Sequence, residues 1–357
     1  MAKYIFTGGG TGGHIFPAVA IANELKKAVP EASILFVGAL GKMEMEKVPQ
    51  AGFEIVGLPV EGLKRSFTIQ NFKIAFKALQ SYFQARKLLR KNQPKWVVGT
   101  GGYASLPVCL AATHMNIPVY AWEGNAFAGL TNKIISKRAK TIFCGFPGME
   151  VQFKFGNWIH SGNPIRTEIL QQAERKQACE FFHLNPDQKV LFITGGSLGA
   201  RSINLAIASL LPYFREHQIQ IIWQTGKFYK HPESSQSGEF ISEFIQRMDL
   251  AYSCADLVIS RSGALSVSEI LATGVPAIFI PSPNVTDDHQ TFNARQAEKG
   301  NGSILIKESN QLEEELKKVI QQLIFNEEKL KSMRENQLKS ARPHATEFIV
   351  KTILNHE

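Results

Sequence analysis

The sequence is poor in cysteine, and the four cysteines that it has are scattered. Cys109, Cys144, Cys179 and Cys254 stand 35, 35 and 75 positions apart. No CxxC pair and no cluster of cysteine and histidine at zinc-ligand spacing occurs, which excludes a disulfide-rich secreted domain and a zinc-finger protein. We therefore expect a reducing, cytoplasmic compartment.

Long uninterrupted apolar segments are also missing. The N-terminus, MAKYIFTGGG, lacks the apolar region of about 7–15 residues that a signal peptide requires, so we expect no export signal. The longest run without Asp, Glu, Lys or Arg, 96–122, could span a bilayer by length, but three glycines and two prolines interrupt it. This run predicts strands, turns and a short helix inside a soluble core.

No residue class dominates the composition. The chain is 44% hydrophobic and 20% charged, which excludes a largely disordered, collagen-like or coiled-coil protein. Forty Lys and Arg against 31 Asp and Glu give a net charge of +9, which indicates an anionic partner: nucleic acid, a phosphorylated small molecule or an acidic membrane surface. At roughly 150 residues per domain, the 357 residues predict two domains.

A strand, a glycine-rich turn and a helix occur twice in the chain, 187 residues apart. In the first copy the apolar strand 3–7 leads into GGGTGGH at 8–14. In the second copy the strand 189–194 leads into GGSLGA at 195–200. A glycine-rich turn between a strand and a helix aims backbone N–H groups at an anion, whereas the alternative interpretation is a tight turn without a ligand.

Other short apolar strands alternate with helical stretches in both halves. The predicted strands are 33–37, 96–98, 119–122, 141–144, 220–224, 257–260 and 277–280. This alternation predicts two parallel, doubly wound α/β sheets.

Turn residues and prolines give the expected boundaries. The turn-rich Ser161–Pro164 predicts a domain boundary after residue 162. Pro212 is expected to end a helix over 202–211. One long charged helix is expected over 312–339, and Pro343 separates it from a short final helix.

The glycine turns fit neither of the common nucleotide fingerprints. Dinucleotide binding requires an acidic residue at the end of the second strand, but no carboxylate follows Val37 until Glu44. The segment Gly38–Met43 has two residues, not four, before its Gly-Lys pair, so it is not a Walker phosphate loop. The turns therefore predict phosphate or sugar binding by something other than NAD or a P-loop nucleotide.

Two polar segments in the second half are candidate contacts for a phosphate or sugar ligand. In SRSGALSVSE, residues 260–269, the small residues at a helix start can bind a diphosphate, and Glu269 can accept hydrogen bonds from ribose hydroxyls. The alternative is a capped helix with a solvated glutamate. Metal binding by Asp287, Asp288 and His289 is conceivable. However, Asp-x-Asp, the acidic metal-binding triplet of metal-dependent glycosyltransferases, does not occur in the chain. Contacts from this segment to sugar hydroxyls are therefore favoured.

Six segments, spread over both halves, carry a family resemblance. They are GGGTGGHIFPAVAIA at 8–22, GTGGYASLP at 99–107, GNPIR at 162–166, GGSLGARSIN at 195–204, SRSGALSVSEI at 260–270 and DDHQTFNA at 287–294. In type and order they resemble the MurG family, the undecaprenyldiphospho-muramoylpentapeptide β-N-acetylglucosaminyltransferases of bacterial peptidoglycan synthesis. The resemblance covers essentially the whole chain.

The resemblance implies a GT-B fold, with two Rossmann-like domains facing each other across a cleft. Residues 1–162 would bind the acceptor and associate with the membrane, residues 163–343 would bind UDP-GlcNAc, and the last helix, 344–357, would pack back on the first domain. The implied reaction moves N-acetylglucosamine from UDP-GlcNAc to the 4-hydroxyl of the MurNAc of lipid I, forming lipid II with inversion and without a cofactor or metal. The implied place is peripheral, on the cytoplasmic face of the inner membrane, with proteins of cell-wall synthesis and division as partners.

The resemblance also implies a set of UDP-GlcNAc contacts. The matching positions are Thr11, Gly12, Gly13, Asn125, Arg166, Ser197, Ile245, Ala264, Leu265, Ser266, Val267, Ser268, Glu269 and Gln290. In these roles Ile245 would contact the uracil through its backbone, Glu269 the ribose and Ser197 the phosphate. Asn125 and Gln290 would contact the sugar.

The chain departs from the family pattern at four positions. Trp122 and Gly124 replace the His and Gln of the usual His-Glu-Gln-Asn, Leu198 replaces a Gln and Thr100 replaces a Phe. Tyr103, which the family also has, is retained as a substrate contact.

Inversion by a single displacement needs a base and stabilisation of the departing diphosphate. His14 is the first candidate base because its unperturbed pKa of about 6.5 suits neutral pH. The alternative is that His14 only positions the acceptor, and Glu123 is the second candidate base. Backbone N–H groups near Ser197 and Gly263, with Arg166 or Arg261, would meet the charge on UDP.

A basic, aromatic stretch is a candidate membrane surface. Within 63–91, Phe72, Phe76, Leu79 and Phe83 recur at helical spacing, and eight cations, including Lys73 and Lys77, surround them without an acidic residue. This predicts contact with an anionic inner leaflet. The alternative is that the stripe packs on its own domain.

Two other function classes remain open. One is a GT-B protein with another acceptor, or a UDP-GlcNAc 2-epimerase, which shares the architecture but not GGTGGH with GGY. The other is a non-enzymatic nucleic-acid-binding or membrane-binding protein. No stacking motif or basic-region pattern supports it, so we expect no nucleic-acid partner.

Overall fold

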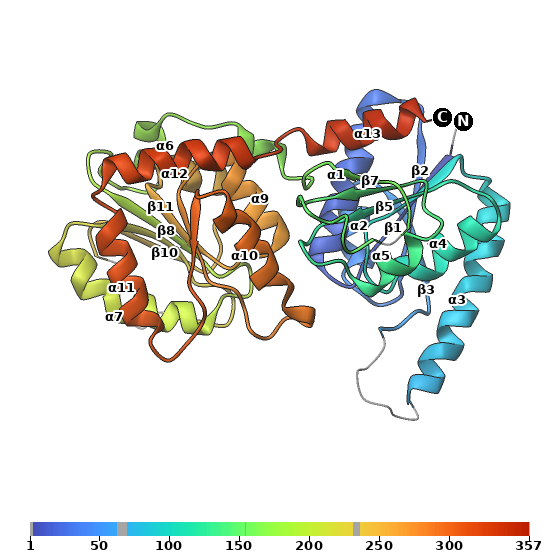
Figure 1. Cartoon of the computed structure of the whole chain (residues 1–357), viewed down its shortest axis with the longest axis horizontal. Helices are drawn as coiled ribbons and strands as arrows, with labels where there is room; N and C mark the ends of the chain where they lie inside the picture. Colours follow the sequence, from blue (N-terminus) through green and yellow to red (C-terminus); the bar gives the residue numbers. More distant parts are fainter. Residues whose placement is uncertain (1–2, 63–69, 154, 231–235, 357) are drawn as a thin grey trace. The chain divides into compact units, whose positions relative to one another are not determined.

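The computed structural model describes residues 3–62, 70–153, 155–230 and 236–356. The chain divides into two compact units (Figure 1): unit 1 comprises the residues up to Ile165 together with 344–357, and unit 2 comprises Arg166–Pro343. The predicted boundary after residue 162 lies three residues before this division.

Unit 1 is built on a seven-stranded sheet whose neighbouring strands pair in parallel, in the order β3-β2-β1-β4-β5-β6-β7. The strands are β1 (Lys3–Thr7), β2 (Ser33–Ala39), β3 (Glu54–Leu58), β4 (Trp96–Gly99), β5 (Val119–Glu123), β6 (Thr141–Cys144) and β7 (Trp158–His160). The order reverses direction between β1 and β4, so right-handed crossovers place the helices on opposite faces.

The helices of unit 1 form two packed groups. The helices are α1 (Gly12–Ala28), α2 (Glu44–Gln50), α3 (Gln70–Asn92), α4 (Ser105–His114), α5 (Leu130–Ile135) and α13 (Ala345–Asn355). Helix α1 packs against α2 and α13, while α4 packs against α3 and α5. The C-terminal helix therefore completes the layer that α1 begins.

Unit 2 is built on a six-stranded parallel sheet in the order β10-β9-β8-β11-β12-β13. The strands are β8 (Val190–Thr194), β9 (Gln220–Gln224), β10 (Glu239–Ser242), β11 (Leu257–Ser260), β12 (Ala277–Phe279) and β13 (Ser303–Leu305). The helices are α6 (Arg175–Phe181), α7 (Arg201–Glu216), α8 (Met248–Cys254), α9 (Ala264–Thr273), α10 (His289–Lys299), α11 (Leu312–Leu323) and α12 (Glu327–Ser340), with short 3₁₀ turns at Thr167–Leu170 and Thr286–Asp288. The order reverses between β8 and β11.

The interior strands of both units are buried on both faces, as expected for parallel strands covered by helices. Strands β4 and β5 of unit 1 and β8 of unit 2 are buried along their whole length. Their continuous apolar sequences led to the prediction of an α/β fold, and the two parallel sheets confirm it.

Two helix predictions are wrong. Pro212 does not end its helix, because α7 runs through it to Glu216 and buries Phe214 in the core on the far side. The single helix expected over 312–339 is two helices, α11 and α12. Asn326 interrupts the pattern, since its side chain accepts a hydrogen bond from Lys329 N at 3.0 Å and caps α12.

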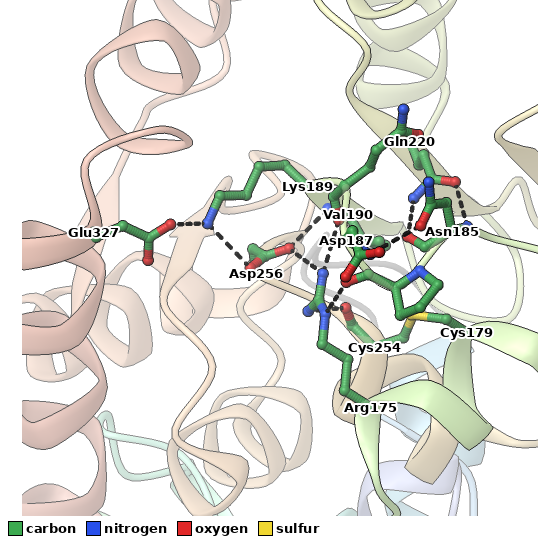
Figure 2. Close-up of polar contacts among 12 residues, drawn as sticks. Arg175, Cys179, Asn185, Asp187, Lys189, Val190, Gln220, Cys254, Asp256 and Glu327 are labelled. Carbon is green, nitrogen blue, oxygen red and sulfur yellow. Dashed lines mark hydrogen bonds and ion pairs between the residues drawn. The ribbon is translucent and has the colours of Figure 1, made fainter.

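A polar cluster joins the amino ends of two unit 2 strands (Figure 2). Asp256, just before β11, accepts hydrogen bonds from Val190 N at 2.8 Å and from Arg175 Nη2 at 2.9 Å. The guanidinium of Arg175 also donates to the carbonyl oxygens of Pro186, Gln188 and Cys254. This cluster lies at the end of the sheet opposite the glycine turn, so its role is structural.

Candidate active site

Two loops of unit 1 meet at the carboxyl ends of β1 and β4, next to the point where the strand order reverses. Open parallel sheets bind their ligands at such a point. Thr100 Oγ1 donates to the carbonyl of His14 at 2.8 Å and links the loops. Gly102 has φ of 75°, and a Cβ at this position would lie 2.3 Å from Gly9 O. Only glycine at 102 allows this close approach.

His14 lies in the first turn of α1, against both loops. Its Nδ1 is 3.2 Å from Gly9 O and 3.2 Å from Thr11 Oγ1. A carbonyl oxygen only accepts, so this contact assigns the proton to Nδ1 and leaves Nε2 as the basic nitrogen. A Cβ at Gly101 would lie 3.2 Å from Nε2, so this loop runs directly past the ring.

Glu123 holds the loop that follows β5. The residue is buried, and its carboxylate accepts hydrogen bonds from Asn125 N at 3.0 Å, Gly129 N at 2.9 Å and Asn132 Nδ2 at 2.9 Å. Three donors around one carboxylate hold this loop in place. These contacts suit a residue that positions Asn125.

Two departures from the family pattern depend on each other. The indole of Trp122 is buried, and a Cβ at Gly124 would lie 2.4 Å from its Cη2 atom. The large side chain at 122 therefore requires glycine at 124.

Tyr103 lies against the first glycine loop, where a Cβ at Gly10 would be 3.0 Å from its ring. Burial raises the pKa of Tyr103, and the carboxylates of Glu44 and Glu61 raise it further. The phenol therefore stays protonated at neutral pH and can donate to a substrate oxygen.

The corresponding loops of unit 2 lie at the carboxyl ends of β8 and β11. Gly196 and Gly199 both have positive φ, and a Cβ at Gly199 would lie 2.2 Å from Thr225 O. The loop between them presents Ser197 and Leu198 to solvent. The departure at Leu198 is thus a surface change that leaves the turn intact.

Glu269, on α9, is not a solvated glutamate. Its side chain is only 9% exposed, and Arg166 donates from Nε to Oε1 at 2.9 Å and from Nη2 to Oε2 at 3.0 Å. Burial lowers the pKa of Arg166, but the hydrogen bonds and charge of Glu269 more than offset this and raise it. The two predicted donor contacts form one bidentate unit.

The amino end of α9 is a further anion-binding element. Gly263 is its N-cap, and within the described parts of the chain no side chain caps this end. Ser262, just before this end, is fixed by two residues of α10: its hydroxyl donates to Gln290 O at 2.9 Å and its carbonyl accepts from Asn293 Nδ2 at 3.1 Å. The first-turn N–H groups and the helix dipole favour a negative charge here.

Three other residues predicted to contact UDP-GlcNAc already make hydrogen bonds within the protein. Arg261 donates to the carbonyl oxygens of Ile280 and Pro281 and to Ser202 Oγ, and it pairs with Glu308 at 2.6 Å. Gln224 Oε1 accepts from Ile245 N at 2.9 Å, so a base contact at Ile245 would fall to its carbonyl. Gln290 Oε1 accepts from Ser282 N at 2.9 Å, which leaves its amide group for a ligand.

The segment 287–289 shows no metal-ligand arrangement. Within the described ranges, no three His, Cys, Asp or Glu side chains form a group that could hold a metal ion. Asp288 instead accepts from Thr291 Oγ1 at 2.6 Å, and His289 Nδ1 lies 2.7 Å from Thr286 O.

Comparison with known proteins decides the family. The glycosyltransferase family 28 N-terminal domain matches residues 4–144, and the C-terminal domain of the same family matches residues 190–348. A protein of Flavobacterium psychrophilum named UDP-N-acetylglucosamine--N-acetylmuramyl-(pentapeptide) pyrophosphoryl-undecaprenol N-acetylglucosamine transferase is 46% identical over 99% of this chain and 97% of its own. The chain belongs to the MurG family.

Solved structures agree with this assignment. The crystal structure of Acinetobacter baumannii MurG is 27% identical, has a TM-score of 0.78 and covers 99% of this chain and 100% of its own. The glycosyltransferase of kitacinnamycin, 12% identical with a TM-score of 0.74 over 99% of this chain and 98% of its own, shows the same fold. As a member of the MurG family the chain is a glycosyltransferase with a GT-B fold.

In this MurG family member, α3 presents an apolar stripe to solvent. Phe76, Leu79 and Phe83 are 69%, 54% and 57% exposed, whereas Ile74, Ala85 and others on the opposite face are buried. The alternative that these three residues pack on their own domain is therefore wrong. The side chain of Phe72 and residues 63–69 lie outside the described part.

The charges around the stripe are not all unpaired. Lys73 is exposed, but Lys77 forms an ion pair with Glu61 at 2.5 Å. An acidic residue just outside the predicted basic stretch therefore compensates one of its cations. No described helix has the length and apolar character that crossing a membrane requires.

Sequence reasoning missed Glu44. Its position in the sequence is too far from the second strand for a dinucleotide contact, yet it is fully buried beneath the first glycine loop. A single glutamate among helix-forming residues gives no sequence signal of burial.

Proposed function

We propose that the chain transfers N-acetylglucosamine from UDP-GlcNAc to the 4-hydroxyl of the muramoyl sugar of lipid I, with inversion, and so forms lipid II. One observation carries the proposal: relatives at 41–46% identity, which align with nearly the whole chain, bear the name of this transferase. The retained His14, Glu123, Tyr103 and Glu269 supply the chemistry that the reaction needs.

Unit 2 would bind the donor. Bidentate Arg166 uses one lone pair on each oxygen of Glu269, and the remaining lone pairs can accept from the ribose 2′- and 3′-hydroxyls. The diphosphate would lie at the amino end of α9 and the Ser197 turn, where backbone N–H groups meet the charge that develops on UDP. Arg261 braces the neighbouring loops, so its part would be indirect.

Unit 1 would bind the acceptor and supply the base. His14 Nε2 would take the proton from the acceptor hydroxyl as that oxygen attacks the anomeric carbon. Glu123, held by three donors, would position Asn125 against the substrate. Thr11, Gly12 and Gly13 remain predicted UDP-GlcNAc contacts.

A direct assay tests the proposal. Radiolabelled UDP-GlcNAc is offered with lipid I, with unrelated lipid and small-molecule acceptors, and with no acceptor. Transfer to lipid I alone is expected. Transfer to another acceptor only, or formation of UDP-ManNAc without an acceptor, would overturn the assignment in favour of another GT-B activity or a 2-epimerase.

The exposed stripe on α3 supports a peripheral place on an anionic membrane, where the polyprenyl chain of the acceptor lies. Aromatic side chains enter the interface, and each nearby cation contributes about 1 kcal/mol. Lys73 and Lys87 flank the stripe at helical spacing and are exposed. Contacts with proteins of cell-wall synthesis and division stay a prediction.

Charge reversal at these two lysines tests the membrane surface. Lys73→Glu with Lys87→Glu should weaken binding to phosphatidylglycerol vesicles and lower activity on long-chain lipid I, but not on a short-chain soluble acceptor. Lys318→Glu with Lys331→Glu, which makes the same charge change on exposed helix positions of unit 2, is the control. Equal vesicle binding by the two double variants at low salt would place the membrane contact elsewhere.

A further inference from the structure

A carboxylate is built into the base of the first glycine loop. Glu44 begins α2 and is fully buried. Its Oε1 accepts from Ala39 N at 3.0 Å, and its Oε2 accepts from Gly10 N at 3.0 Å. A Cβ at Gly9 would lie 2.1 Å from Oε1, and one at Gly38 would lie 2.6 Å from Cγ. Glycine at both positions makes room for this carboxylate.

The peptide group between Gly9 and Gly10 connects Glu44 to His14. Its N–H points to Glu44 Oε2, and its carbonyl oxygen lies 3.2 Å from His14 Nδ1. In a planar trans peptide the N–H and the C=O point in opposite directions, so a hydrogen bond at one end fixes the direction of the other. The negative charge of Glu44, which lies against this N–H, also polarises the peptide group and makes its carbonyl a better acceptor.

Thr11 does not decide the tautomer of His14, but the peptide does. The hydroxyl of Thr11, also 3.2 Å from Nδ1, can either donate or accept. The carbonyl of Gly9 can only accept, so it requires a proton on Nδ1.

We propose that Glu44 is a positioning residue for the transfer reaction, acting through the Gly9–Gly10 peptide to hold His14 in the Nδ1–H tautomer. This inference rests on the proposed role of His14 as the base. The acceptor hydroxyl gives its proton to Nε2 while its oxygen forms the new bond to the anomeric carbon. The bond from that carbon to UDP breaks, and its electron pair leaves with the diphosphate. Glu44 exchanges no proton, and its charge stabilises the imidazolium that forms.

The charge of Glu44 reaches a second side chain at the same place. Burial raises the pKa of Tyr103 first, and the charge of Glu44 is the next contribution. The carboxylate therefore acts on the electrostatics of this loop as well as on its shape.

The tautomer can be read in the wild-type enzyme. In wild-type enzyme with ¹⁵N-labelled histidine, the ring nitrogen shifts of neutral His14, assigned by their loss in His14→Gln, should show protonated Nδ1 and unprotonated Nε2. A protonated Nε2 would overturn the inference.

Kinetics then test whether Glu44 acts through His14. Glu44→Gln keeps one acceptor oxygen but loses the charge, so kcat should fall at least about tenfold, with UDP affinity unchanged. The acid limb of the pH profile should move down by about half a unit or more, because the lost negative charge lowers the pKa of His14. In a His14→Gln background the same change should cost little more.

Three results would count against the inference. An equal loss from Glu44→Gln with and without His14 would make Glu44 a structural residue. A wild-type kcat in His14→Gln would overturn the proposed base and this inference with it. A protonated Nε2 beside a large loss of kcat in His14→Gln would overturn this inference alone. Glu46→Gln, an exposed neighbour on the same helix, is the control and should keep wild-type kinetics.

Discussion

Removing the carboxylate of Glu269 should weaken UDP binding, and the number of lone pairs that Arg166 leaves on this carboxylate limits the size of the loss. Arg166 occupies one lone pair on each carboxylate oxygen, so up to two charge-assisted hydrogen bonds remain for ribose hydroxyls. Hydrogen bonds to charged groups contribute about 1.5–3 kcal/mol each, and the expected loss counts one such bond. For Glu269→Ala we therefore expect UDP affinity to fall roughly ten- to over a hundredfold.

Calorimetric titration with UDP measures this effect directly. Glu314→Ala, an exposed glutamate on α11, makes the same change of charge and should leave the affinity unchanged. Arg166→Met should also weaken UDP binding, because it leaves the buried carboxylate without its partner. If Arg166 acts by orienting Glu269, the double variant should lose less than the sum of the two single losses. An unchanged UDP affinity in folded Glu269→Ala would refute the ribose contact.

Two further predictions separate catalysis from stability. His14→Ala should lower kcat by about 10²–10⁴ while the KM for UDP-GlcNAc stays near wild type; a loss confined to the acceptor KM would instead give His14 a positioning role. Arg175→Ala, which strips hydrogen bonds from three carbonyl oxygens and from Asp256, should lower the free energy of unfolding in urea by about 2–3 kcal/mol. UDP affinity of the folded variant should be unchanged, and an unshifted urea midpoint would contradict the structural role of Arg175.

The sequence predicted the interior strands well because their burial leaves a continuous apolar pattern. The predicted bounds of β1, β6, β9 and β11 match the structure. The four strands that were not predicted are β3, β7, β10 and β13, which are the outer edges of the two sheets. Edge strands are partly exposed and short: β7 and β13 have three residues each, and all of β10 is only partly buried. In β7 and β13 too few residues remain to show a pattern, and β3 and β10 lack the continuous burial of the interior strands.

The candidate site was predictable in its loops but not in its side-chain partners. Glycine clusters after apolar strands mark loops, since few other residues adopt positive φ or allow such close backbone approach. The partner of each polar group depends on residues far along the chain. Arg166 and Glu269 are 103 positions apart, and Gly10 and Glu44 are 34 positions apart. No local spacing encodes such pairs.

The two glycine turns share a fold but differ in what their amides bind, and this difference bears on their ligands. In unit 1 the N–H of Gly10 donates to the carboxylate of Glu44, so a diphosphate placed there would meet a buried negative charge. In unit 2 the N–H groups of Gly196 and Gly199 donate to neutral oxygens, those of Thr194 and of the Gly196 carbonyl. A departing diphosphate is therefore better tolerated at the second turn, whereas the charge at the first turn favours a group that becomes positive, as His14 would in its proposed role as the base. This difference supports the proposed assignment, in which the diphosphate of UDP binds at the unit 2 turn and His14 of unit 1 takes the proton.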